Sequence, residues 1–210
     1  MSHNMNRDDV LKDKPTLQNV TGIVLAGGQS RRMHGIDKGL LLIDQQPMAL
    51  RVINSLRHQT TKQLVVCQSR QRAHYAKLCD HVLTDQQFAG SGPLAGLLAA
   101  RDHLTTPYFA VAACDLPQLS DYWVSTLLTP LLATGATLAV AHTEGTQRNA
   151  LLGVGHRSTL EGLEALIGRG HLRWHDWITA QSKVIRIPLP DHELLNVNRS
   201  SDLVSKDLSV

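Results

Sequence analysis

Short apolar runs alternate along this sequence with segments of helical periodicity, and this alternation limits the possible folds more than any other feature. The runs are almost continuously hydrophobic, which is typical of strands buried on both faces. The expected strands are Ile23–Ala26, Leu64–Cys67, His81–Leu83, Tyr108–Ala113, Ala136–Ala141, Ala150–Val154 and Val184–Ile187, with a short extended segment at Leu40–Ile43. We therefore expect an α/β fold, a three-layer sandwich with a mostly parallel, Rossmann-like sheet.

Helices are expected between most of these strands. Ser120 is expected to cap one of them, with Asp121 in its first turn, where a carboxylate interacts favourably with the helix dipole. The expected helices are Pro47–His58, Gln71–Leu78, Pro93–His103, Ser120–Leu132, Thr159–Ile167 and Arg173–Ala180, followed by a last short helix capped by Ser200 or Ser201. Ligands of such sheets bind beyond the carboxyl ends of the strands, so the loops that follow strands are the candidate functional segments.

The loop after the first strand combines two glycines with several cations. Gly27 and Gly28 end the strand, and Arg31, Arg32 and Lys38 follow closely. Glycine allows close backbone approach to a ligand, and cationic side chains with exposed N–H groups bind phosphates. The loop matches neither the Walker A pattern nor the dinucleotide fingerprint. It is interpreted as a nucleotide-phosphate loop, the alternative being a solvated loop with surface arginines.

Further candidates follow the later strands. Asp115 ends the Tyr108–Ala113 strand region, where its carboxylate could bind Mg²⁺ that bridges nucleotide phosphates, or could simply serve a turn. Asp85 has the same ambiguity and could instead orient a ribose or base. Gly92 and Gly96 allow either backbone approach to a ligand or close helix–sheet packing.

A third polar motif lies near the end of the chain. Asn196 and Asn198 flank Val197, and in an extended segment both amides point the same way. They either hold a turn together or offer amides to a polar ligand and metal-bound water.

Composition limits the partners and the compartment. Aromatic residues make up 4% of the 210 residues and the formal net charge is +3, which does not favour a nucleic-acid platform. No run of about eighteen apolar residues predicts a membrane span, and three cysteines without a CxxC pair favour reduced thiols in the cytoplasm. Residues 1–18 are expected to form a flexible N-terminal extension without a secretory signal, and residues 19–210 a single domain.

Five motifs together resemble a known family. They are LAGGQSRRM at residues 25–33, GIDKG at 35–39, GPLAG at 92–96, CDLP at 114–117 and NVN at 196–198. Their order and spacing are similar to those of the molybdenum cofactor guanylyltransferases, which belong to the wider sugar-nucleotidyltransferase-like group, and the resemblance covers about residues 21–203. It implies transfer of GMP from GTP to the terminal phosphate of molybdenum-molybdopterin, with Mg²⁺ as cofactor and molybdoenzyme-maturation proteins as partners.

The resemblance also implies residue roles. Leu25, Ala26 and Gly27 would contact the guanine nucleotide through their backbone, Arg32 and Lys38 would neutralise triphosphate charge, Asp85 would help hold the nucleoside and Asp115 would bind Mg²⁺. Cys67 occupies a nucleotide-contact position where the family often has Asn. The cofactor side, or the junction between the two substrates, would be formed by Gly92, Gly96, Arg173, Asn196 and Asn198.

Two alternatives remain open from the sequence. A cytidylyltransferase acting on the same cofactor usually has Leu-Ala-Ala-Gly where this chain has Leu25-Ala26-Gly27-Gly28. The second glycine leaves room for a purine and favours GTP. A non-catalytic carrier of the molybdenum cofactor would not need both the phosphate loop and Asp115.

Overall fold

A seven-stranded sheet forms the centre of the molecule. The computed structural model describes residues 19–27, 37–85, 92–143 and 149–197. The strand order is β5-β4-β1-β6-β8-β7-β9, and every pairing is parallel except those of β8, which runs antiparallel to β6 and β7. The strands are β1 (Val20–Leu25), β4 (Lys62–Cys67), β5 (Val82–Thr84), β6 (Tyr108–Ala113), β7 (Leu138–Thr143), β8 (Asn149–His156) and β9 (Val184–Leu189). The predicted α/β fold with a mostly parallel sheet is confirmed.

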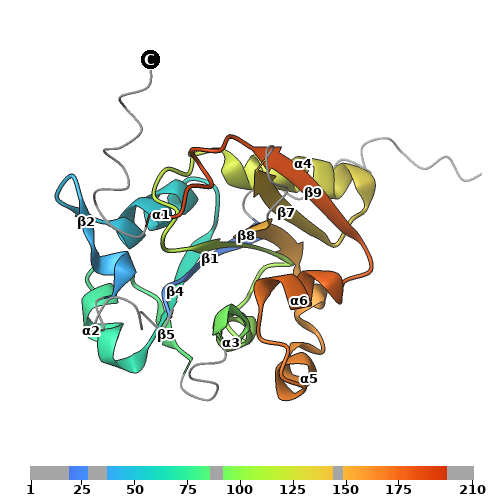
Figure 1. Cartoon of the computed structure of the whole chain (residues 1–210), viewed down its shortest axis with the longest axis horizontal. Helices are drawn as coiled ribbons and strands as arrows, with labels where there is room; N and C mark the ends of the chain where they lie inside the picture. The colour runs from blue at the N-terminus through green and yellow to red at the C-terminus, as the bar shows by residue number, and fades with distance from the viewer. Residues whose placement is uncertain (1–18, 28–36, 86–91, 144–148, 198–210) are drawn as a thin grey trace, which may run out of the picture.

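Helices cover both faces of the sheet (Figure 1). One face packs against α1 (Met48–Arg57) and α4 (Trp123–Thr134), and the other against α3 (Gly92–Arg101), α5 (Leu163–Gly168) and α6 (Trp174–Thr179). The remaining elements are short: α2 (Arg72–Tyr75), the 3₁₀ helices η3 (Lys38–Leu40), η4 (Ser69–Gln71) and η6 (Arg157–Leu160), and a hairpin of β2 (Leu42–Ile43) with β3 (Gln46–Pro47).

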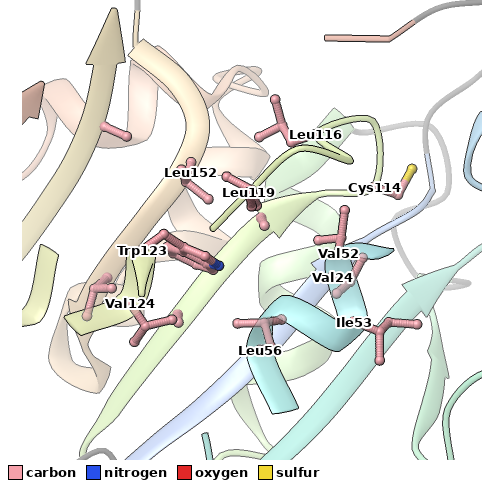
Figure 2. Close-up of a cluster of buried hydrophobic side chains, with 14 of the residues drawn as sticks. Val24, Val52, Ile53, Leu56, Cys114, Leu116, Leu119, Trp123, Val124 and Leu152 are labelled. Atoms are coloured by element: carbon pink, nitrogen blue, oxygen red, sulfur yellow. The ribbon is translucent and has the colours of Figure 1, made fainter. Parts of the chain in front are cut away.

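Two large hydrophobic clusters lie on opposite faces of the sheet, because successive side chains of a strand point to opposite faces. Along β1, Val24 points into the cluster with α1 and α4, whereas Ile23 and Leu25 point into the cluster with α3 and α6. Figure 2 shows the first cluster, in which the Trp123 ring lies between the sheet and the helix layer. The Trp123 indole N–H donates to Ser55 Oγ at 3.2 Å, which joins α4 to α1.

The expected cap at Ser120 is wrong. Helix α4 begins only at Trp123, its N-cap residue is Tyr122, and no acidic side chain lies in its first turn. The N–H of Ser120 instead donates to Oε2 of the buried Glu193 at 3.0 Å. A distant carboxylate therefore holds the segment that the local pattern assigned to the helix.

Two other expected helices differ in extent. The segment Gln71–Leu78 contains only the four-residue α2, preceded by η4. The segment Thr159–Ile167 is divided into η6 and α5 by Gly162, whose φ of 74° interrupts the helix. An extended segment was predicted at Leu40–Ile43, but its pairing with β3 in a hairpin was not predicted. The expected extension at residues 1–18 and the helix at Ser200 or Ser201 lie outside the described residues.

No helix in the described ranges has both the length and the apolar character that crossing a membrane requires.

Candidate functional site

Several of the predicted site residues lie at one edge of the sheet, at the ends of its parallel strands. Strands β5, β4, β1 and β6 are neighbours and run parallel, so their carboxyl ends lie side by side (Figure 1). The Ala26 N–H donates to the Val66 carbonyl at 2.8 Å, and the Cys114 N–H donates to the Leu25 carbonyl at 3.1 Å. These bonds hold the segments that follow β1, β4 and β6 together, and they already use part of the Leu25 and Ala26 backbone.

Gly27, Gln68 and Asp85 form one corner of this edge. The Gln68 side-chain amide donates to the Gly27 carbonyl at 3.2 Å. A Cβ placed on Gly27 would lie 3.2 Å from Oδ2 of Asp85, so the absence of a side chain keeps the strand end close to this carboxyl group. Asp85 is 7% exposed, and burial raises its pKa. The residue also lines one end of a pocket of about 530 Å³ between β5 and α3.

Lys38 and Asp115 form the second corner. The Nζ of Lys38 lies 3.8 Å from Oδ2 of Asp115, although 77 positions separate the residues in sequence (115 − 38). The Asp115 side chain is 17% exposed, and its Oδ1 atom is buried without a hydrogen-bond partner in the described part of the chain. Burial raises the pKa of Asp115, and the Lys38 charge opposes that rise. Asp115 thus has a buried carboxylate oxygen with unused acceptor capacity, and its other oxygen faces Lys38.

This carboxylate fits one kind of metal site. Within the described ranges no three His, Cys, Asp or Glu side chains cluster closely enough to hold a metal by themselves. Mg²⁺ needs no such cluster, because it is commonly bound by one or two carboxylates together with substrate phosphates and water. The unpartnered Asp115 Oδ1 beside Lys38 matches that donor set.

The segment before Asn198 reaches the same edge. The Val197 N–H donates to the Asp115 carbonyl at 3.0 Å, and the Val197 side chain packs against Ile43 and Met48. This anchor places the exposed Asn196 close to Asp115 in the fold. Asn198 and Arg32 were also predicted in the site, and both lie outside the described residues.

Gly92 and Gly96 begin helix α3 and have different roles. Gly92 has a φ of 68°, and a Cβ there would lie 2.7 Å from the Leu172 carbonyl oxygen, so this glycine brings the start of α3 against the segment that leads to Arg173. A Cβ on Gly96 would lie 2.7 Å from Leu25 Cδ2, which favours the interpretation of close helix–sheet packing. Arg173 is exposed at the N-terminus of α6.

Cys67 is placed differently from the exposed candidates. Its side chain is fully buried in the cluster with α1 and α4, and burial raises the pKa of the thiol to about 12. The neighbouring Gln68 is the residue after β4 whose polar side chain reaches Gly27. A polar amide side chain therefore follows the buried Cys67 by one position at this end of β4.

Sequence reasoning missed a buried contact behind Lys38. Asp37 Oδ1 accepts hydrogen bonds from the Tyr75 hydroxyl at 2.8 Å and from the Gly39 N–H at 2.9 Å. The position of Asp37, directly before Lys38, was a signal that could have been used. Tyr75 had none, because its role depends on a contact across 38 positions.

The fold is similar to the nucleotidyltransferase-like folds of solved structures. The structure of molybdopterin-guanine dinucleotide biosynthesis protein A from Archaeoglobus fulgidus superimposes with a TM-score of 0.70 at 20% identity, over 89% of this chain and 99% of that one. A 4-diphosphocytidyl-2C-methyl-D-erythritol synthase from Anaerococcus prevotii gives 0.68 at 8% identity, over 90% and 94%. At these identities the likeness concerns the fold.

Sequence comparison gives the particular family. The model of the MobA-like NTP transferase domain matches residues 22–184, and the chain belongs to this family. The molybdenum cofactor guanylyltransferase of Shewanella putrefaciens is 31% identical over 79% of this chain and 84% of its own length. The protein of the same name from Burkholderia cenocepacia is 30% identical over 91% and 97%. The family resemblance predicted from the motifs is confirmed.

Proposed function

We propose that this protein transfers GMP from GTP to the terminal phosphate of molybdenum-molybdopterin. A phosphate oxygen of the acceptor attacks the α-phosphorus of GTP, the bond from that phosphorus to the bridging oxygen breaks, and pyrophosphate leaves. The product is the guanine dinucleotide form of the cofactor. Because the attacking phosphate is already anionic, the reaction needs positioning and charge neutralisation more than a general base.

The observation that carries this proposal is the pairing of Lys38 with Asp115 at the sheet edge where β1 also ends. Lys38 would neutralise triphosphate charge, assisted by Arg32, while the backbone of Leu25, Ala26 and Gly27 contacts the nucleotide. The relatives named molybdenum cofactor guanylyltransferase support the choice of substrates.

Mg²⁺ is proposed as the cofactor, held by Asp115 and by phosphate oxygens of the substrates. When bound, the ion supplies charge neutralisation at the triphosphate and lowers the cost of pyrophosphate departure. The protein's contribution is a carboxylate whose buried Oδ1 keeps a free acceptor position. The ammonium group of Lys38 lies 3.8 Å from the second carboxylate oxygen, Oδ2, and interacts with it electrostatically.

The nucleoside is proposed to bind at the corner of Gly27, Gln68 and Asp85. These groups bring a carboxylate, an amide and a strand end without a side chain into one small region. Gln68 takes the polar role expected at Cys67, whose contribution is limited to the backbone because its thiol is buried.

Molybdenum-molybdopterin is proposed to bind near the start of α3, Arg173 and Asn196. The start of α3 at Gly92 and the exposed Arg173 come together there, and Asn196 lies near Asp115 with Asn198 two positions later. Gly96 acts by packing α3 against β1. The proposed partners are molybdoenzyme-maturation proteins. The three unpaired cysteines support a cytoplasmic location.

Calorimetric titration of GTP and of CTP, each with Mg²⁺, tests the substrate assignment. We expect GTP to bind at least about tenfold more tightly than CTP, since a site that hydrogen-bonds one base leaves polar groups unpaired with another. Tighter CTP binding would identify a cytidylyltransferase instead.

The Gln68 side chain gives a second test of the nucleoside site. Gln68→Ala is expected to weaken GTP binding, whereas Gln71→Ala, a matched change on η4, leaves it unchanged.

A further inference from the structure

A buried tyrosine lies behind the turn that carries Lys38. Tyr75 is the last residue of the short helix α2 and is fully buried. Its hydroxyl donates to Oδ1 of Asp37 at 2.8 Å. Asp37 is the N-cap residue of η3, and the same Oδ1 atom accepts the Gly39 N–H at 2.9 Å. One carboxylate oxygen thus fixes the backbone on both sides of Lys38 and ties it to α2.

The surroundings leave this turn little freedom. A Cβ placed on Gly39 would overlap the Tyr75 hydroxyl oxygen and would lie 3.2 Å from both Ala49 Cβ and Cys114 Sγ. Glycine therefore permits η3 to press against α1, α2 and the end of β6 at once. Cys114 directly precedes Asp115, so the turn carrying Lys38 is packed against the segment carrying its partner.

The hydrogen-bonding state of the two side chains is well defined. Burial raises the pKa of Tyr75, and the adjacent Asp37 carboxylate raises it further, so the hydroxyl remains protonated and donates. Burial also raises the pKa of Asp37, while the hydrogen bonds from Tyr75 and Gly39 and the charges of Arg70 and His74 oppose this rise.

We propose that Tyr75 is a positioning residue: its hydroxyl holds Asp37 and thereby fixes the turn that directs the Lys38 ammonium group at Asp115 and at the nucleotide phosphates. The inference deepens the proposed function and rests on it for the identity of the nucleotide. Tyr75 contacts neither substrate, and it acts through the Asp37 carboxylate. A side chain that only fills the core would need no hydroxyl at this point.

A double-mutant cycle on GTP binding separates positioning from simple packing. Tyr75→Phe keeps the ring and removes the hydroxyl, and we expect it to raise the Kd for GTP with Mg²⁺ by about tenfold, the effect of losing a hydrogen bond to a charged group. In a Lys38→Ala background the same substitution is expected to change Kd by less than about twofold, because the positioned group is gone. Tyr108→Phe, at the opposite end of β6, is the matched control and changes neither value.

A second pair of variants separates the hydrogen bonds from the charge. Asp37→Asn retains an acceptor oxygen for Tyr75 and Gly39 and is expected to keep the Kd within about threefold of wild type, whereas Asp37→Ala raises it by about tenfold. Amide hydrogen exchange gives a readout that is independent of GTP. The peptide covering residues 37–41 should exchange faster in Tyr75→Phe than in wild type and Tyr108→Phe.

The possible outcomes separate the role of Tyr75 from the proposed binding of GTP. Unchanged GTP binding by folded Tyr75→Phe, or equal losses in both Lys38 backgrounds, would overturn the positioning role. Unchanged exchange at residues 37–41 would overturn the hydrogen-bonded turn itself. If the wild-type protein binds no GTP, the proposed function fails, and the exchange experiment still decides whether Tyr75 holds the turn.

Discussion

At the scale of single residues, Lys38 and Asp115 carry the proposed chemistry. Replacing Lys38 with Ala should lower GMP transfer by about a hundredfold, the usual effect of removing one group that stabilises transition-state charge. Asp115→Ala should lower it at least as much if this carboxylate holds Mg²⁺. Steady-state transfer assays on folded variants measure both effects. Lys183→Ala, on an exposed lysine before β9, is the control, and near-normal turnover by Asp115→Ala would remove the metal assignment.

Asp115 should also reduce the stability of the ligand-free protein. Its pKa is raised in the folded state, so folding favours the protonated form, and the ionised form costs stability as pH rises through the raised pKa. Asp115→Asn should therefore be more stable than wild type by about 1 kcal/mol near neutral pH. The difference should shrink as pH falls and disappear below about pH 3, where the wild-type carboxyl is protonated in both the folded and the unfolded state.

Thermal unfolding of wild type and Asp115→Asn across this pH range measures the effect. A wild type that becomes more stable than Asp115→Asn as pH rises would show that the 3.8 Å pairing with Lys38 outweighs the cost of burial.

At the scale of elements, β8 shows how glycine permits dense packing within the sheet. A Cβ on Gly155 would lie 2.8 Å from Cζ of Phe109 and 3.2 Å from Leu138 Cδ1. Gly155→Ala should therefore destabilise the fold by about 1–3 kcal/mol through overpacking. Gly168→Ala is the control, since a Cβ there meets nothing within 4 Å. Urea unfolding measures both, and equal stability of the two variants would contradict the rigid packing of β8.

Elements were predictable where local pattern decides them. The apolar runs gave β1, β4 and β6 within a few residues, and Pro47 marked the start of α1. The predicted helix cap at Ser120 was wrong because the Ser120 N–H donates to Glu193, which is 73 positions away in the sequence. The antiparallel direction of β8 was not predicted, because an apolar run carries no information about its direction until its neighbours are known.

At the scale of the whole molecule, the sequence predicted which strand ends contribute to the candidate site, but it did not predict the contacts that hold its turns. Parallel strands bring their carboxyl ends to one edge, and this rule alone predicted that Gly27, Asp85 and Asp115 belong together. The turn held by Tyr75 and Asp37 could not be predicted, because it depends on the packing of α1, α2 and the residue after β6 around Gly39.

The central claim is that this chain is a guanylyltransferase and not a carrier of the cofactor. The most direct measurement mixes the purified protein with GTP, Mg²⁺ and molybdenum-molybdopterin and quantifies pyrophosphate and the guanine dinucleotide product. We predict equal amounts of both, formed by wild type and Lys183→Ala and lost in Asp115→Ala. Binding of the cofactor without release of pyrophosphate would contradict the account and indicate a carrier.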